Sequence, residues 1–339
     1  MSSSDEVYRT ASASHGEVQS AGITVTTQGP NGRVIWGLVI AAWLTACVMF
    51  GVTISKVSSE HRATADVSTL PAAGSNRLVV TFLDVRQGDS IFIRTPGKKT
   101  ILIDGGSRGN EYSTYDGGYE SVVPFLEAYG IKSLDLVVAT HPHNDHIGGL
   151  IAVLENFPVK SFLDPGLVYA SATYEHLLTL VKTKGIAYEV AERGSLIELD
   201  PAILLQILAP SQTAGDSFSA VNNASIVLRL VYRDVSFLLT GDIEREVETD
   251  VLNFGHGIKS TFLKVPHHGS DTSSSEFFVQ QVRPAVGIVS VGKYNKFGHP
   301  SKEVLERYQA IGTKLYRTDV NGNVTVITDG FAYNVITER

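Results

Sequence analysis

Short apolar runs separated by turn residues follow one another along most of the chain. Runs rich in valine, isoleucine and leucine are typical of strands, whereas apolar positions that recur about every three to four residues are typical of helices. The sequence therefore predicts strands at 78–83, 90–94, 100–104, 134–139, 159–163, 202–208, 225–231, 235–239, 262–265 and 286–291. It predicts helices near 122–129, after His146, over 172–183, from Ile243 and from Lys302. The first three strands are joined by tight turns, which indicates an antiparallel opening, and helices then alternate with strands.

The N-terminal part of the chain has a different pattern. Residues 1–33 are rich in serine, threonine and glycine without an apolar period, which predicts a disordered tail. Residues 34–54 are 21 positions without a charged side chain. That length is sufficient for one membrane-spanning helix of about 20 residues. Residues 55–76 are expected to form a linker, and the globular domain is expected at 77–339.

Three other interpretations of residues 34–54 are a buried helix, a cleaved signal peptide and a lipoprotein signal. Trp36 and Trp43, together with the polar linker that follows, favour a membrane segment over a buried helix. A signal peptide would carry its charged start near the N-terminus rather than behind a long tail. The residues before Cys47 resemble a lipoprotein cleavage box, but the apolar run continues beyond Cys47. We therefore expect a membrane anchor.

Composition and charge limit the classes of function. An apolar content of 43% and a charged content of 19% in 339 residues are ordinary for a folded protein. The net charge of −7 argues against binding nucleic acid through a broad basic surface. A phosphate-bearing substrate would therefore have to bind at a local concentration of positive charge, and a metal ion can supply such a charge. The single cysteine excludes an intramolecular disulfide framework and a cysteine-based zinc site.

The densest chemistry lies in the segment 140–149, THPHNDHIGG. It follows a predicted strand and leads into a predicted helix, so its histidines lie on a strand-to-helix loop. In extended chain, residues two apart point the same way, so His141 and His143 can bind one ion. Asp145 and His146 turn back on the first helical turn. Three of only ten histidines fall within six positions, which favours a metal site over structural or solvated roles.

Further polar clusters follow strand-like runs later in the chain. The cluster that begins at Asn222 is the first. Asp242 directly follows a predicted strand and a glycine, and it either bridges two ions or caps the next helix. His267 and His268 follow another strand, and because adjacent histidines can face different partners, one can be a ligand and the other a proton carrier. His299 is either a site residue or a loop histidine before a helix.

In this order, the motifs resemble the metallo-β-lactamase fold, and within it the hydrolase domain of the ComEC family of competence DNA-uptake proteins. The resemblance covers 77–339 and rests on 82–90 (FLDVRQGDS), 102–106 (LIDGG), the histidine-rich segment and the later clusters. It implies an α/β protein, an αββα four-layer sandwich with a zinc or manganese site at one edge of its two sheets, and hydrolytic activity. One departure is Arg86, which stands where the family usually has glycine.

Carried over residue by residue, the resemblance implies one ligand pair, His141 and His143, a second set, Asp145, His146 and His267, and a bridging carboxylate, Asp242. It also implies that Asp104 orients the ligand loop without binding the ion. The third histidine of the first site is missing, since His176, the histidine in that interval, lies in a helical pattern that predicts a surface position. Asn222 and Asn223 stand in its place. An amide is a weaker and harder ligand than imidazole, which favours manganese (Mn²⁺) over zinc (Zn²⁺), or one ion instead of two.

The leading functional hypothesis is a metal-dependent phosphodiesterase, a nuclease acting on DNA outside the cytoplasm. The ions would lower the pKa of a bound water and polarise the bond under attack. Asp145 would act in catalysis through the metal, with His268 or His299 protonating the leaving oxygen. Two alternatives are a hydrolase of a lactam, lactone or phosphocholine ester, since fold does not determine substrate, and a non-catalytic metal-binding module. Retention of the ligand-type side chains disfavours the second.

The family carries a many-helix membrane channel, whereas this chain has one candidate span, so we expect a stand-alone hydrolase domain tethered to the membrane through residues 34–54. Lysine and arginine flank this span on both sides, so the charge rule for orientation decides nothing. A DNA-uptake-type hydrolase meets its substrate outside the cell. We therefore expect an N-in, C-out anchor with the catalytic domain in the periplasm or at the cell exterior.

Overall fold

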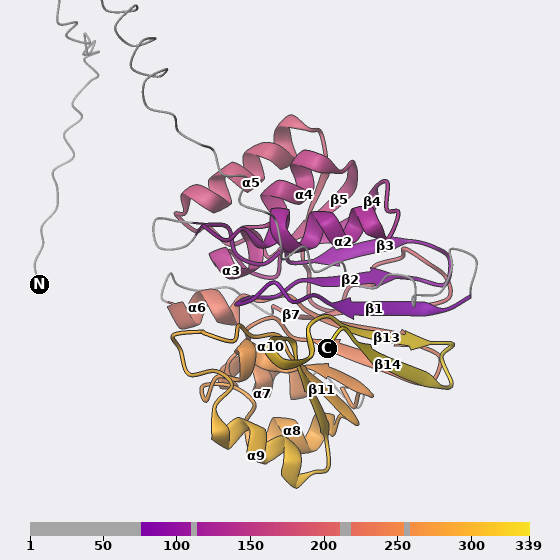
Figure 1. The fold of residues 1–339 in the computed structure, drawn as a ribbon, viewed down its shortest axis with the longest axis vertical. Helices are drawn as coiled ribbons and strands as arrows, with labels where there is room; N and C mark the ends of the chain where they lie inside the picture. The colour runs from indigo at the N-terminus through magenta and orange to yellow at the C-terminus, as the bar shows by residue number, and fades with distance from the viewer. Residues whose placement is uncertain (1–75, 110–113, 211–217, 254–257) are drawn as a thin grey trace, which may run out of the picture. The chain divides into compact units, whose positions relative to one another are not determined.

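A computed structural model describes residues 76–109, 114–210, 218–253 and 258–339. The predicted tail and anchor and nearly all of the predicted linker lie outside the described residues, so these predictions stay predictions. Within those ranges no helix combines the length and the apolar character that a membrane span requires. The described residues from 76 onward form two β-sheets with helices on their outer faces (Figure 1).

The first sheet has the strand order β14-β13-β1-β2-β3-β4-β5-β6. Along the chain its strands are β1 (Leu78–Phe82), β2 (Ile91–Arg94), β3 (Thr100–Ile103), β4 (Leu134–Val138), β5 (Val159–Asp164), β6 (Ala187–Val190), β13 (Val324–Thr328) and β14 (Tyr333–Thr337). Neighbours from β14 to β3 pair antiparallel, which confirms the predicted opening, and those from β3 to β6 pair parallel.

The second sheet has the strand order β12-β11-β10-β9-β8-β7. Its strands are β7 (Leu204–Ala209), β8 (Val227–Tyr232), β9 (Val235–Leu239), β10 (Phe262–Lys264), β11 (Val286–Val289) and β12 (Lys314–Arg317). β7, β8 and β9 pair antiparallel, whereas β9 to β12 pair parallel. Because parallel neighbours end at the same edge, the loops that follow β9, β10 and β11 lie together.

Alternating side chains of both sheets form the central core. Val80 and Phe82 of β1 belong to one apolar cluster with Leu228 and Leu230 of β8. The opposite faces pack against helices: η2 (Gly118–Val122), α2 (Val123–Ala128), α3 (Asn144–Ile147), α4 (Leu150–Asn156) and α5 (Ala172–Thr183) cover the first sheet, and α7 (Arg245–Asn253), α8 (Glu276–Val282) and α9 (Lys302–Ala310) cover the second. The short elements α6 (Phe218–Asn223), η3 (Pro266–Gly269) and α10 (Thr318–Asn321) lie in connections. The layer order is therefore αββα.

The predicted elements and the structure differ in informative places. The helix predicted after His146 is two short helices, α3 and α4, which meet at two glycines. A Cβ on Gly149 would lie 2.0 Å from the carbonyl oxygen of Gly105, so only glycine allows this close approach. The Asn222 cluster, expected behind a strand, ends helix α6 instead. The prediction missed β6, β12, β13, β14, α6, α8 and α10.

Candidate metal centre

The polar side chains predicted to form a site come together at one edge of the two sheets. Asp104 follows β3, and His141 follows β4, its parallel neighbour in the first sheet. Asp242 follows β9, and His268 follows β10, its parallel neighbour in the second sheet. Residues that follow neighbouring parallel strands lie at the same edge of the sheet, which explains how positions far apart in sequence meet.

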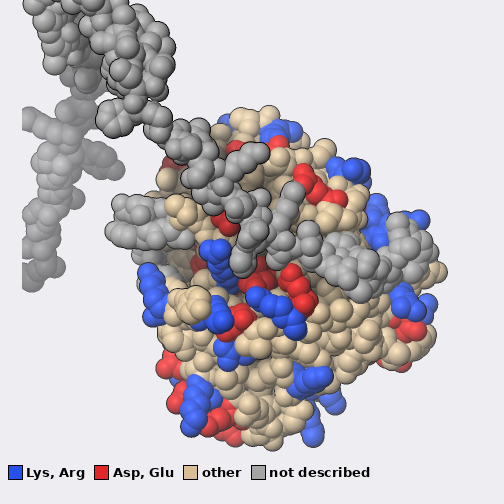
Figure 2. All heavy atoms as spheres, in the orientation of Figure 1, with Lys and Arg blue, Asp and Glu red and all other residues tan. Residues whose placement is uncertain are grey.

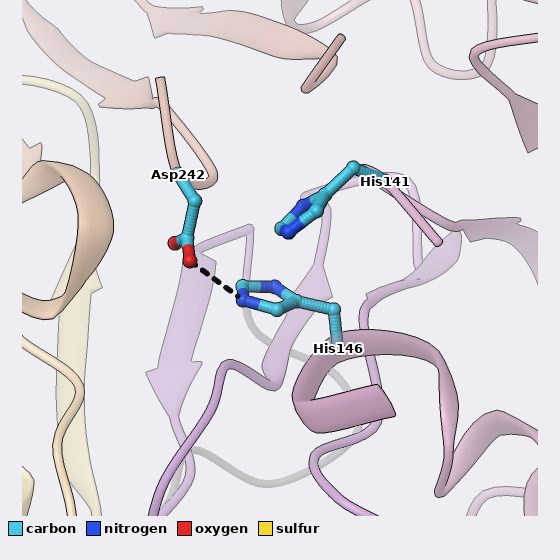
Figure 3. Close-up of side chains that lie close together, drawn as sticks. All are labelled: His141, His146 and Asp242. Carbon is cyan, nitrogen blue, oxygen red and sulfur yellow. Dashed lines mark hydrogen bonds and ion pairs between the residues drawn. The ribbon is translucent and has the colours of Figure 1, made fainter. Parts of the chain in front are cut away.

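His141, His146 and Asp242 form the first group (Figure 3). One ligand atom from each lies within 4.8 Å of the others, and all three side chains are buried. His146 Nε2 is 3.1 Å from Asp242 Oδ2. This contact places Asp242 among the histidines, away from the start of α7, whose cap it was alternatively predicted to be.

A second group shares His146 and adds Asp145 and His268. His268 Nε2 lies 3.4 Å from Asp145 Oδ2 and 3.2 Å from Asp242 Oδ2. Its other ring nitrogen, Nδ1, donates to the carbonyl oxygen of Ser290 at 2.8 Å. That hydrogen bond sets the tautomer and leaves Nε2 facing the carboxylates as a ligand atom.

The structure therefore places His268 where we expected His267. Both residues have left-handed backbone angles, with φ of 48° for His267 and 54° for His268. His267 points to a different set of partners, with Nδ1 3.2 Å from Thr272 Oγ1 and Nε2 3.4 Å from Asn222 Nδ2. Two adjacent histidines do face different partners, as predicted, and it is His268 rather than His267 that lies beside the carboxylates of Asp145 and Asp242.

The other predicted residues lie at different distances from the two groups. His143 Nδ1 is 3.0 Å from His141 Nε2. Asn222 is fully buried and donates through Nδ2 to Glu244 Oε1 at 2.9 Å. Because the amide nitrogen is used there, Oδ1 is the atom left for an ion, and it makes no hydrogen bond within the described part of the chain.

Asn223 does not share this orientation. Its side chain bonds Glu246 and the backbone amide of Glu244, away from the histidines. His176 lies on α5 and contacts Arg108, in agreement with the predicted position on a helix. His299 lies at the rim, with its ring centroid 5.5 Å from that of His267.

Asp104 has the geometry of a residue that positions a ligand. Its carboxylate accepts hydrogen bonds from the Thr140 backbone amide at 2.8 Å and the Thr140 hydroxyl at 2.7 Å. It also contacts His146 Nδ1 at 2.8 Å, which directs His146 Nε2 toward the ion site. Asp104 has a φ of 57°, a strained value for a residue other than glycine.

Comparison with known proteins identifies this arrangement. Residues 83–293 match the family described as the metallo-beta-lactamase superfamily. The chain belongs to the metallo-β-lactamase superfamily. That match covers Asp104, the histidine-rich segment, Asp242, His267 and His268. The fold of this superfamily implies one or two divalent metal ions.

Two curated relatives confirm the resemblance to ComEC-family competence proteins. The chain is 36% identical over 254 residues to ComE operon protein 3 of Bacillus subtilis, covering 72% of this chain and 32% of the relative. It is 31% identical over 252 residues to competence protein ComA of Neisseria gonorrhoeae, covering 74% of this chain and 32% of that one. The chain thus spans about a third of the length of either relative.

Among solved structures, CmlA, a diiron β-hydroxylase from Streptomyces venezuelae, superposes with a TM-score of 0.47 at 15% identity. The superposition covers 73% of this chain and 53% of CmlA.

Two charged residues of this metallo-β-lactamase site did not enter the predicted ligand set. Lys264 and Asp89 are both buried, and Lys264 Nζ lies 2.7 Å from Asp89 Oδ2. Lys264 Nζ is also 3.7 Å from Asp242 Oδ1 and donates to the carbonyl of Gly241. Their positions in the sequence could have indicated both residues. Asp89 belongs to the FLDVRQGDS segment, and Lys264 lies three residues before His267.

The loop that carries Asp89 packs directly against the ligand loop. A Cβ on Gly88 would lie 1.9 Å from the carbonyl oxygen of Asp145, so this contact requires glycine. Arg86, at the position where the family usually has glycine, has a φ of 60°. Its guanidinium stacks over the ring of Tyr115 at 3.8 Å, a contact that offsets part of the backbone strain.

The charge balance of the site fits a cation. Burial opposes ionisation of Asp242, but His146 and His268 lower its pKa well below 3.8. Burial also opposes protonation of His268, yet Asp242 and Asp145 raise its pKa to about 10. Burial and the nearby His146 lower the pKa of His141 well below 6.5, which favours the neutral, metal-binding form. Protonated imidazoles thus supply positive charge that a divalent ion can replace.

The donor set also fits an ion. Among the described residues, the buried atoms Asn222 Oδ1 and Asp242 Oδ1 make no hydrogen bond. Buried polar atoms normally have a partner. Imidazole and carboxylate together suit zinc and other divalent transition metals. The residues therefore suit the metal ions that the superfamily implies.

Proposed function

We propose that this metallo-β-lactamase domain is a metal-dependent phosphodiesterase that cleaves DNA outside the cytoplasm. The observation that carries the proposal is that His146 belongs to two groups of ligand-type side chains: one adds the buried His141 and Asp242, and the other adds the partly exposed Asp145 and the buried His268. The similarity to competence proteins supports DNA as the substrate. Figure 2 shows lysine and arginine interspersed with acidic side chains on the face drawn, which fits local capture of phosphate at the site.

The residues divide into two ligand sets. His141, His143 and Asn222 would hold one ion, and Asp145, His146 and His268 would hold the other, with Asp242 between them. A divalent ion held there supplies a Lewis acid and lowers the pKa of water. The amide oxygen of Asn222 is a harder ligand than a third imidazole, which supports manganese, or a single zinc, over two zinc ions.

With His268 among the ligand groups, His267 and His299 are left as proton carriers. Burial, followed by the positive charge of His268, lowers the pKa of His299 to about 4. Burial also lowers the pKa of His267. Neutral imidazoles accept protons from water or pass them on near neutral pH. This assignment replaces the expectation that His268 protonates the leaving oxygen.

We further propose that residues 34–54 anchor the chain with its N-terminus in the cytoplasm and the hydrolase domain outside. Support comes from the uncharged run in the sequence and from the resemblance to DNA-uptake proteins. Alkaline phosphatase fused after Arg339 should be active, whereas a fluorescent protein that folds only in the cytoplasm should stay dark. The opposite pair of results would place the domain in the cytoplasm.

Activity is tested with a panel of three substrates, DNA, bis-p-nitrophenyl phosphate and nitrocefin, each with added manganese or zinc. We expect cleavage of both phosphodiesters by the wild type and loss of cleavage in His141→Ala. His176→Ala removes the same side chain from helix α5 and should keep full activity. Hydrolysis of nitrocefin alone would indicate a different bond, and metal binding without hydrolysis would indicate a binding module.

A further inference from the structure

A cavity of about 410 Å³ opens at the end of the second sheet opposite the metal centre. Ser236 at the start of β9 and Thr261 just before β10 line it, whereas Asp242 and His268 follow the other ends of these strands. Because β9 has five residues, at about 3.3 Å each, the two sites are about 16 Å apart. The cavity is therefore separate from the proposed catalytic residues.

Positive charge dominates the lining. It contains four basic side chains, Arg229, Arg233, Lys259 and Arg283, against one carboxylate, that of Asp234. This concentration runs counter to the net charge of −7 on the whole chain. None of the four basic groups forms an ion pair with any residue that the structure describes. Four positive charges gathered in one concavity with a single negative charge attract anions.

Arg229 gives the clearest indication of a ligand. It is half-buried on β8, and its Nε is buried without a hydrogen bond to any described residue. Burial alone lowers the pKa of its guanidinium, with no opposing carboxylate. A buried donor without an acceptor is unfavourable. An anion in the cavity would supply the acceptor through a charge-assisted hydrogen bond.

The floor of the cavity adds neutral donors. The Ser236 hydroxyl accepts from the backbone amide of Thr261, and the Thr261 hydroxyl accepts from the backbone amide of Ser236, both at 3.2 Å. A hydroxyl that accepts a hydrogen bond keeps its own hydrogen for donation. At the rim, Arg233 is held by the carbonyl of Asp329 at 3.0 Å and by stacking over Phe331. The lining thus combines cations with held hydroxyl donors.

We propose that this cavity binds a phosphate group, held by Arg229, Lys259 and Arg283 and by the hydroxyls of Ser236 and Thr261. A phosphate offers several acceptor oxygens to donors that surround it, and guanidinium groups match its geometry in a fork. The phosphate belongs either to a small molecule or to a nucleic-acid backbone, since both present the same oxyanion. The site does not rest on the proposed phosphodiesterase activity.

Calorimetric titration of the purified full chain tests this site, with a chelator present to keep metal out of the catalytic groups. Sodium tripolyphosphate is one titrant, and a short single-stranded DNA is the other. The double variant Arg229→Gln, Arg283→Gln should bind tripolyphosphate about tenfold or more weakly. Lys132→Gln removes one exposed lysine near the first sheet and should bind as the wild type does. His141→Ala should also bind normally, because its side chain is at the other end of the sheet.

A second double variant controls for the possibility that substitution of the half-buried Arg229 disturbs folding. Lys259 and Arg283 are both exposed, so Lys259→Gln, Arg283→Gln leaves the sheet intact and should also weaken binding. If DNA binds, tripolyphosphate does not, and the double variants weaken DNA binding, the polymer is the source of the phosphate. Undiminished affinity in both double variants, or no heat with either titrant, would overturn the proposal.

Discussion

Substitution of Lys264 by methionine tests whether the buried ion pair behind the metal centre stabilises the fold. Methionine keeps the length and apolar body of lysine but removes the charge that faces Asp89. At 2.7 Å and an effective dielectric constant of about 20, Coulomb's law assigns this pair about 6 kcal/mol. Part of that energy is offset, because the variant no longer has to desolvate an ammonium group. Removing one member of a buried pair typically costs about 3–5 kcal/mol.

The expected loss is large for a domain of this kind. Folded domains are stable by about 5–15 kcal/mol, so a loss of about 3–5 kcal/mol in Lys264→Met should remove at least about a fifth of the free energy of unfolding. Urea unfolding of the metal-free chain, followed by circular dichroism, measures the change. Lys160→Met is the matched control, because Lys160 forms an ion pair with Asp135 while largely exposed, and such pairs contribute about 0–1 kcal/mol.

A double-mutant cycle identifies the cause. Asp89→Asn, added to Lys264→Met, removes the buried carboxylate that has lost its lysine partner and keeps only the more distant His268 and His146, so the double variant should be more stable than Lys264→Met alone. Two results would refute the reasoning: a loss below about 1 kcal/mol in Lys264→Met, or a double variant no more stable than the single one. Either would mean that the Asp89 carboxylate has another source of compensation.

Three further predictions follow from the geometry. Asn222→His should tighten zinc binding in competitive dialysis. Asn223→His should leave zinc binding unchanged, because the Asn223 side chain faces away from the histidines. Equal effects of the two substitutions would contradict a ligand role for the Asn222 amide oxygen. His268→Ala should lower metal content in elemental analysis, whereas His267→Ala should retain it, and the reverse result would restore the assignment made from sequence. Glu248 is buried, and burial raises its pKa above 4.5. Its contribution to stability is therefore fully present below pH 4.5 and is lost as pH rises through the folded-state pKa. The stability of the wild type relative to Glu248→Gln should fall over that interval, and a difference independent of pH would show that the pKa is not raised.

Local pattern was sufficient to predict the bounds of two elements, helix α5 and the strand β9 that precedes Asp242. Helix α5 was predicted over 172–183 and is Ala172–Thr183, and strand β9 was predicted over 235–239 and is Val235–Leu239. Helix α5 buries Tyr174, Leu177 and Val181 at helical spacing, whereas β9 is a short apolar run that is buried throughout. Strand β6 was missed because its four residues are exposed, so it has no apolar alternation to detect.

The sequence alone also determined where most of the chemistry lies. Three histidines and an aspartate within six positions predict a metal site on a loop, and motif order predicts the fold of the superfamily. These inferences hold because ligand type and short spacing are properties of the chain itself. A strand followed by polar residues then indicates which loops meet at the sheet edge.

Tertiary structure alone decided which adjacent histidine joins the carboxylates and which buried lysine lies behind them. Left-handed backbone angles at His267 and His268 direct the two rings to different partners, and spacing along the chain cannot express that choice. Lys264 and Asp89 meet because β10 and the loop after β1 belong to different sheets that pack together. Side-chain orientation and the pairing of distant charges arise from packing between elements, so only the tertiary structure determines them. Residue type and apolar periodicity are local properties of the chain, so the sequence alone determines them.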